Sequence, residues 1–190
     1  LGGGTLTLAG TGAASLATDA FAQSNGTLHN PLTLTLNGGV TPHDWSYGTW
    51  KGGGTVVLAA NGSLSMSHPE MAGQTLQLSG TSSATIRGDG LYAKGTNAIR
   101  IEPTGLLTLD NQGSSFSMTQ LIKAQIGTLS ISNGGTLRSV GAGVSSVGAQ
   151  NSGTLGYGTL LYTSEATSSV QVQAGTLQLT DYGYGLPASA

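Results

Sequence analysis

The sequence predicts an all-β protein built as a right-handed parallel β-helix, in which short strands stack on one another along a common axis. Three observations favour this fold. Glycine makes up 32 of the 190 residues, while charged residues make up only 7%. Turn pairs such as Asn61-Gly62 separate strand-like segments. A phrase of glycine, Thr or Ser, and then alternating apolar residues recurs down the chain, with clear copies at Gly4, Gly54, Gly62, Gly127 and Gly175.

Each copy of this phrase predicts one short strand with one buried face. In Gly4-Thr5-Leu6-Thr7-Leu8, apolar and polar residues alternate, which is the side-chain period of a strand. Short spacings between copies indicate neighbouring strands of one coil, and longer spacings indicate the return to the same face one coil later. We therefore expect coils of about 22 residues, with Leu, Val, Ile and Met stacked inside.

An antiparallel β-sandwich is the alternative fold, because Asn-Gly and Asp-Gly pairs also form two-residue hairpins. We favour the β-helix because the strands are short, open with the same residues, and include only 5% aromatic residues. Two segments, residues 13–23 and 118–124, have compositions that allow one to three helical turns. We expect each to be a loop or a helical cap on a coil.

Composition excludes several kinds of partner and site. The formal net charge is −2, and the six Lys and Arg residues are scattered, which argues against nucleic acid and against a basic membrane-binding face. No run of about 20 apolar residues is present to cross a bilayer. The absence of cysteine excludes disulfides, thiolate nucleophiles and Cys-ligated metals. We expect no cofactor, no nucleic-acid partner and no direct insertion of this segment into a membrane.

The repeated phrases resemble a known family. Segments such as NGGTLRS and QAGTLQLTD, and the repeat style from Gly2 to Thr180, are similar to the passenger regions of bacterial autotransporters and of two-partner-secretion filamentous adhesins. The resemblance implies a right-handed parallel β-helix that is exported and displayed at, or released from, the bacterial cell surface. We therefore expect residues 1–190 to be a single β-helix segment of a longer exported protein.

From these observations we expect a structural or adhesive module and not an enzyme. It would bind glycans, a host surface or copies of itself through a polar, largely uncharged face. One alternative is a glycan-degrading enzyme on the same rod, a lyase or a tailspike-like hydrolase, for which a cluster of carboxylates is needed. The candidate carboxylates are Asp89, Glu102 and Asp110. A second alternative is a structural subunit that forms filaments.

One segment, residues 41–51, differs from the repeats because it concentrates both tryptophans of the chain. Aromatic faces stack on sugar rings, and His or Asp side chains bind hydroxyl groups, so we expect a loop that contacts carbohydrate. The alternative is that both tryptophans cap the apolar interior of a coil. The candidate binding residues are His43, Asp44, Trp45, Tyr47 and Trp50.

A second candidate motif is Arg87-Gly88-Asp89, an RGD tripeptide. On a projecting turn it resembles the integrin-recognition sequence of some bacterial adhesins, although Asp-Gly pairs also form ordinary turns. A metal site is not predicted, because His29, His43 and His68 lie far apart in the sequence.

Overall fold

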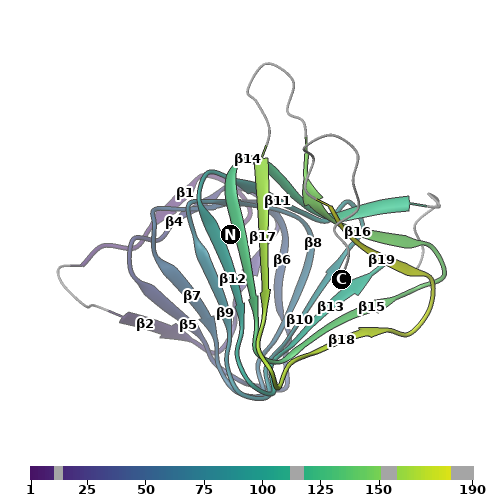
Figure 1. Ribbon diagram of the computed structural model, residues 1–190. Helices are drawn as coiled ribbons and strands as arrows, with labels where there is room; N and C mark the ends of the chain where they lie inside the picture. The colour runs from purple at the N-terminus through teal and green to yellow at the C-terminus, as the bar shows by residue number, and fades with distance from the viewer. Residues whose placement is uncertain (11–14, 112–117, 151–157, 181–190) are drawn as a thin grey trace.

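The computed structural model describes residues 1–10, 15–111, 118–150 and 158–180, which form nineteen strands and no helix (Figure 1). The protein is therefore all-β, as the sequence predicts. Within this part of the chain the strand pairings are parallel, beginning with β1 on β4 and ending with β16 on β19. The antiparallel sandwich is thus wrong for the described residues, since a sandwich needs hairpins and antiparallel ladders.

The parallel pairings arrange the strands in three columns, and the long strands β6, β8 and β14 each belong to two of them. Column 1 contains β1 (Thr5–Thr7), β4 (Thr27–His29), β6 (His43–Lys51), β8 (Ser63–Ala72), β11 (Leu91–Lys94), β14 (Met118–Asn133), β16 (Val144–Ala149) and β19 (Thr176–Thr180). Column 2 contains the end of β14 with β2 (Ser15–Thr18), β5 (Thr33–Leu36), β7 (Thr55–Leu58), β9 (Thr75–Leu78), β12 (Asn97–Ile101) and β17 (Gly158–Ser164). Column 3 contains the first halves of β6 and β8 with β3 (Ala22–Gln23), β10 (Ser83–Arg87), β13 (Leu106–Asp110), β15 (Thr136–Val140) and β18 (Ser169–Val172).

The register shows how the repeated phrase produces the columns. Thr5 pairs with Thr27, and Thr27 pairs with Thr49, so the chain returns to the same column at equal steps that match the expected coil length. The backbone N–H of Thr27 donates to the carbonyl of Gly4 at 2.9 Å, which joins one copy of the phrase to the next. In Figure 1, β2, β5, β7, β9, β12 and β17 follow one another from the left to the centre of the view.

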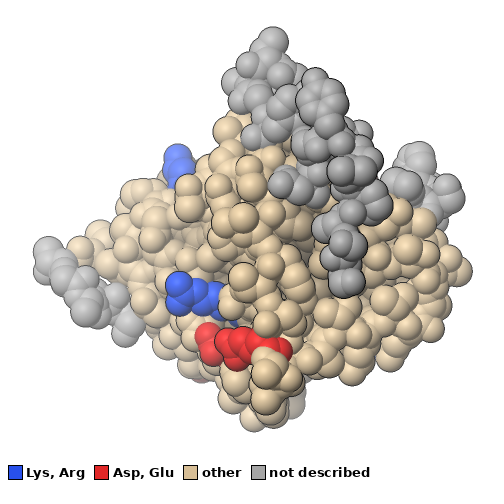
Figure 2. Space-filling model, viewed as in Figure 1, with Lys and Arg blue, Asp and Glu red and all other residues tan. Residues whose placement is uncertain are grey.

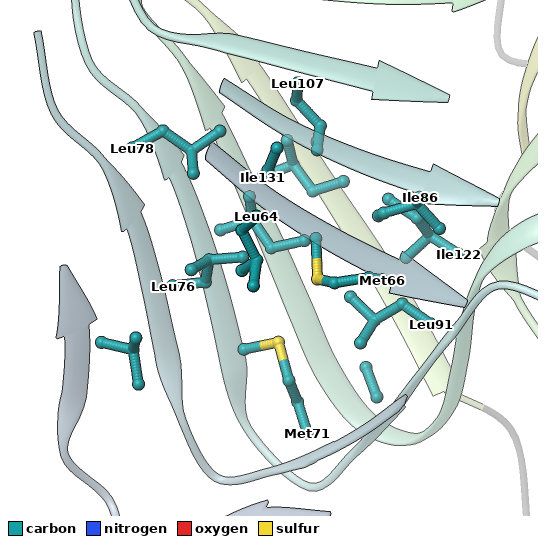
Figure 3. Close-up of a cluster of buried hydrophobic side chains, with 14 of the residues drawn as sticks. Leu64, Met66, Met71, Leu76, Leu78, Ile86, Leu91, Leu107, Ile122 and Ile131 are labelled. Carbon is teal, nitrogen blue, oxygen red and sulfur yellow. The ribbon is translucent and has the colours of Figure 1, made fainter. Parts of the chain in front are cut away.

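Aliphatic side chains form ladders between the columns. In column 2, Leu34 lies on Val56, which lies on Leu76, and alternate residues of each strand are buried because strand side chains point to opposite faces. Figure 3 shows Leu64, Met66 and other buried residues pointing toward one another between the ribbons. The predicted core of stacked Leu, Val, Ile and Met is present in the described residues.

Buried amide side chains satisfy the backbone at the bend between columns 1 and 2. Gln74 Nε2 donates to the carbonyl of Asn30 at 2.9 Å, and the backbone N–H of Gln74 donates to Asn97 Oδ1 at 3.0 Å. Asn97 Nδ2 donates in turn to the carbonyl of Lys94 at 2.9 Å. These three amides are almost fully buried, so their hydrogen bonds replace the water that a bend in the chain otherwise needs. They fix the position at which β11 ends.

The described parts of the two segments with helix-compatible composition are strands. Residues 15–18 and 22–23 form β2 and β3, and Met118 begins the sixteen-residue strand β14; residues 13, 14 and 112–117 lie outside the described part. Helices of this length are marginal on their own, whereas pairing with the adjacent coil satisfies the backbone along the whole strand. Tertiary pairing therefore decides their conformation.

The two tryptophans form the largest packing unit of the interior. Trp45 and Trp50 are both fully buried, and their rings stack in parallel with centroids 3.6 Å apart. Trp50 Nε1 donates to Gln23 Oε1 at 2.7 Å, while Trp45 Nε1 has no hydrogen-bond partner among the described residues. The segment that contains them is strand β6 and not a loop.

This difference between the two indoles predicts a difference in stability. Trp45→Phe and Trp50→Phe remove the same atoms, but only Trp50→Phe breaks a buried hydrogen bond and leaves Gln23 Oε1 without its donor. We expect Trp50→Phe to lower the free energy of unfolding by about 1–3 kcal/mol more than Trp45→Phe does. Urea-induced unfolding followed by circular dichroism measures both values. Equal losses would show that the Trp50–Gln23 hydrogen bond contributes nothing.

Candidate functional site

A hollow of about 380 Å³ lies on the outer face of column 1, and we call it the tyrosine groove. It crosses successive coils, because its residues come from β6, β8, β11, β14 and the segment before β4. Its lining consists of Asn25, Tyr47, Gly48, Thr49, His68, Glu70, Tyr92, Lys94 and Gln125. Aromatic rings, amides, hydroxyls and one charged pair therefore face the same open space.

A bend in two neighbouring strands places the aromatic residues outside. In β6, Trp45 and Trp50 both point inward although five positions separate them, so the inward-outward alternation changes between them. In β8 the same change leaves Ser67 and His68 both outside the core. Because Tyr47 pairs with His68 in register, both outward side chains lie next to each other at the bend.

Gly48 makes the bend in β6 possible. Its φ is 94°, a conformation that residues with a Cβ rarely adopt. A Cβ at this position would also lie 2.4 Å from Gln23 Nε2 and 2.5 Å from the carbonyl oxygen of Gly26, both on the adjacent coil. Only glycine allows the backbone to turn here and to approach its neighbour this closely.

Three aromatic rings and one ammonium group form a continuous row across the coils. The ring centroids of Tyr47 and His68 are 5.2 Å apart, and those of His68 and Tyr92 are 4.9 Å apart. Lys123 Nζ lies 4.3 Å from the centroid of the Tyr92 ring, and it donates to the Tyr92 hydroxyl at 3.0 Å. The rings support one another across strands, which holds the row in place.

The charged groups near this row are paired. Lys94 Nζ donates to Glu70 Oε2, and Thr49 Oγ1 lies 3.5 Å from Glu70 Oε1. His68 Nδ1 lies 3.1 Å from Asp89 Oδ2. Both pairs are partly exposed, since 43% of the Lys94 side chain and 28% of the Glu70 side chain remain accessible, so they screen readily and keep capacity for further hydrogen bonds.

The structure separates the five residues of the predicted carbohydrate loop. Trp45 and Trp50 are buried and offer no ring face to a surface ligand. His43 is also buried, and its Nε2 lies 2.8 Å from the carbonyl oxygen of Asn37. Asp44 is exposed and bonded to Ser46. Only Tyr47, with 51% of its surface exposed, lines the tyrosine groove.

The RGD tripeptide occupies the end of β10 and the turn that follows. Arg87 lies 3.8 Å from Asp110, and the carboxylate of Asp89 faces His68. The backbone N–H of Gly90 donates to the carbonyl of Arg87 at 3.1 Å, which closes the turn, and Gly88 has a φ of 62°. Both side chains are directed to neighbouring coils, and integrin recognition stays a prediction.

The three candidate catalytic carboxylates occupy separate positions. Asp89 lies in the turn after β10, Glu102 follows β12, and Asp110 ends β13. Asp89 contacts a residue of the tyrosine groove, His68, whereas Asp110 lies beside Arg87. This placement gives little support to a shared carboxylate centre.

Most residues of the groove were not predicted from the sequence. His68, Glu70, Tyr92 and Lys94 belong to coils other than that of Tyr47. A weak signal exists, because Tyr47 and His68 lie about one coil apart in the sequence and are paired in register. The same holds for Glu70 and Tyr92. Finding the groove from this signal requires the register of every coil.

Neither a metal centre nor a membrane-spanning helix is found in the described residues. Within these ranges, no three His, Cys, Asp or Glu side chains gather closely enough to hold a metal ion. The same ranges contain no helix that is long and apolar enough to pass through a bilayer.

Comparison of the chain with protein-family models, with curated proteins and with solved structures found no match. The function is therefore inferred from the geometry of the tyrosine groove.

Replacing Gly48 tests the bend that presents Tyr47. Gly53 is a matched control, since its φ of 82° is equally unusual but a Cβ there meets nothing within 4 Å. We expect Gly53→Ala to cost about 1–2 kcal/mol from the backbone conformation. Gly48→Ala should cost about 1–3 kcal/mol more, because its Cβ overlaps the adjacent coil. Equal denaturation midpoints for the two variants would contradict a tight approach at Gly48.

Proposed function

We propose that this chain is a segment of a right-handed parallel β-helix from an exported bacterial surface protein, and that it binds glycans through the tyrosine groove. Three columns of parallel strands, in which Thr5 pairs with Thr27 and Thr27 with Thr49, support the β-helix. Right-handed winding is the expected hand, because crossovers between parallel strands are almost always right-handed. The repeat style that resembles autotransporter and filamentous adhesin passengers supports an extracellular or cell-surface location.

The observation that carries the proposal is the chemistry of the groove lining. Sugar rings have apolar C–H faces and many hydroxyl groups, so proteins bind them with aromatic rings surrounded by hydrogen-bonding groups. The groove provides both, with Tyr47 exposed beside His68 and Tyr92, and with Asn25, Thr49 and Gln125 around them. Its open form suits a glycan chain that extends beyond the bound sugars.

The sparse charge of the surface fits the same function. Figure 2 shows a face on which uncharged residues predominate and few charged side chains appear. Hydroxyl and amide groups on such a face make weak, exchangeable hydrogen bonds with glycans. Because each contact contributes little, adhesion would depend on several grooves that engage one glycan-bearing surface together.

The two other functions remain weaker proposals. A glycan-degrading enzyme finds its best support in the His68–Asp89 pair beside Tyr92, which has the residue types of a general acid or base. A filament-forming subunit would use contacts between copies. Incubation of the protein with the glycans that it binds, followed by analysis of the sugars by size, separates a binding module from an enzyme.

A glycan array tests the proposed function directly. We expect the wild-type protein, presented as a multivalent conjugate, to bind a subset of glycans, and Tyr47→Ala to lose at least about 1 kcal/mol of the binding free energy, or about fivefold in affinity. Arg100→Ala is the matched control, because Arg100 is exposed on β12 in column 2, away from the groove. Loss of binding in both variants, or in neither, would contradict a role for the groove.

A further inference from the structure

We propose that the tyrosine groove selects neutral sugars and disfavours acidic ones. This inference rests on the proposed glycan-binding function and specifies its ligand class. It is carried by the state of the charged groups in and beside the groove, each of which already has a partner of opposite charge or a hydrogen-bond partner. A bound anion would have to displace one of them.

The charged pair in the lining is compensated before any ligand binds. Lys94 and Glu70 form an ion pair, so the lining contributes one positive and one negative group that largely cancel. An acidic sugar that approached Lys94 would bring its carboxylate close to Glu70, and the two like charges would repel. A neutral sugar incurs no such cost.

The same pair retains the hydrogen-bonding capacity that a diol requires. Lys94 has three N–H donors and uses one of them on Glu70, while the Glu70 carboxylate accepts from Lys94 and lies near Thr49, with lone pairs remaining. A pair of neighbouring sugar hydroxyls can therefore accept from Lys94 and donate to Glu70 at once. Acceptance and donation side by side match a vicinal diol.

Lys123 does not supply a free positive charge to the site. Its Nζ donates to the carbonyl of Asp89 at 2.6 Å and to the hydroxyl of Tyr92 at 3.0 Å, and it lies beside the Tyr92 ring. Asp89 adds a carboxylate next to His68. The groups beside the groove thus repeat the balance of charge found in its lining.

Tyr47 is the ring with room for a sugar. His68 contacts Tyr47 on one side and Tyr92 on the other, and Lys123 lies over Tyr92. In the coil before Tyr47, the register places the small residue Asn25 at the corresponding position. A sugar ring can therefore lie against Tyr47 above Asn25, within hydrogen-bonding range of a side-chain amide.

The test compares matched ligands at two salt concentrations. Isothermal titration of the wild-type protein with oligomers of galactose and of galacturonic acid measures the preference. The titrations are made in about 20 mM and in about 300 mM NaCl, because the screening length differs several-fold between these concentrations. We expect the galactose oligomer to bind more tightly, with an affinity that changes less than about twofold with salt.

The variant Glu70→Gln sharpens the test. It removes the negative charge but keeps an amide oxygen that accepts a hydrogen bond, so Lys94 becomes uncompensated. We expect its affinity for the galacturonic acid oligomer to rise about two- to fivefold at low salt, with little change for the galactose oligomer. Unfolding midpoints equal to that of the wild type establish that the variant is folded.

The possible outcomes separate the two proposals. Tighter, salt-dependent binding of the acidic oligomer by the wild-type protein would overturn the preference for neutral sugars but leave glycan binding intact. An unchanged acidic affinity in Glu70→Gln would also overturn it, since compensation by Glu70 is its cause. If no glycan of the array and neither oligomer binds, the proposed function fails and this inference fails with it.

Discussion

Parallel backbone pairing between successive coils is the constraint on which the rest of the structure depends. Each coil donates and accepts along three columns, as in the bond from Thr27 N–H to the carbonyl of Gly4. Because side chains alternate along a strand, fixing the register also fixes which residues point inward. The ladder from Leu34 to Val56 and Leu76 follows directly, and it buries apolar surface without long-range hairpins. The same register brings outward side chains from different coils into one surface row.

The tyrosine groove is a consequence of where this regular pattern is interrupted. Between Trp45 and Trp50 the strand bends at Gly48, and the two indoles stack inside while Tyr47 projects outside. One local change therefore stabilises the core and presents the exposed ring. A substitution that relaxed the bend would affect both the interior and the groove, whereas Tyr47 can be altered without touching the indole stack. Stability and binding are separable at this point of the chain.

The sequence predicted the fold more completely than the site. The all-β class, the parallel stacking step and the aliphatic interior all follow from the Gly-Thr-Leu phrase, because each copy specifies its own strand. The segment around Trp45 is recognisably unusual in the sequence, but the prediction assigned its tryptophans to the surface, whereas they are buried. Composition reports that aromatic residues are concentrated there, and it does not report which of them points inward. The helical composition of residues 118–124 misled for a related reason, since a strand partner outweighs weak helix propensity.

The sequence by itself determined the period, the polarity of alternate positions and the shortage of charge, because each is a property of local spacing and composition. Only the tertiary structure decided that Tyr47, His68 and Tyr92 form one row and that Lys94 meets Glu70 beside it. These contacts join different coils, and the described coils are unequal in length, since β2 pairs with β5 over a much shorter stretch of chain than β15 with β18. A change of one residue in any intervening coil would move a side chain to the opposite face, so their meeting depends on the completed register and not on any local pattern.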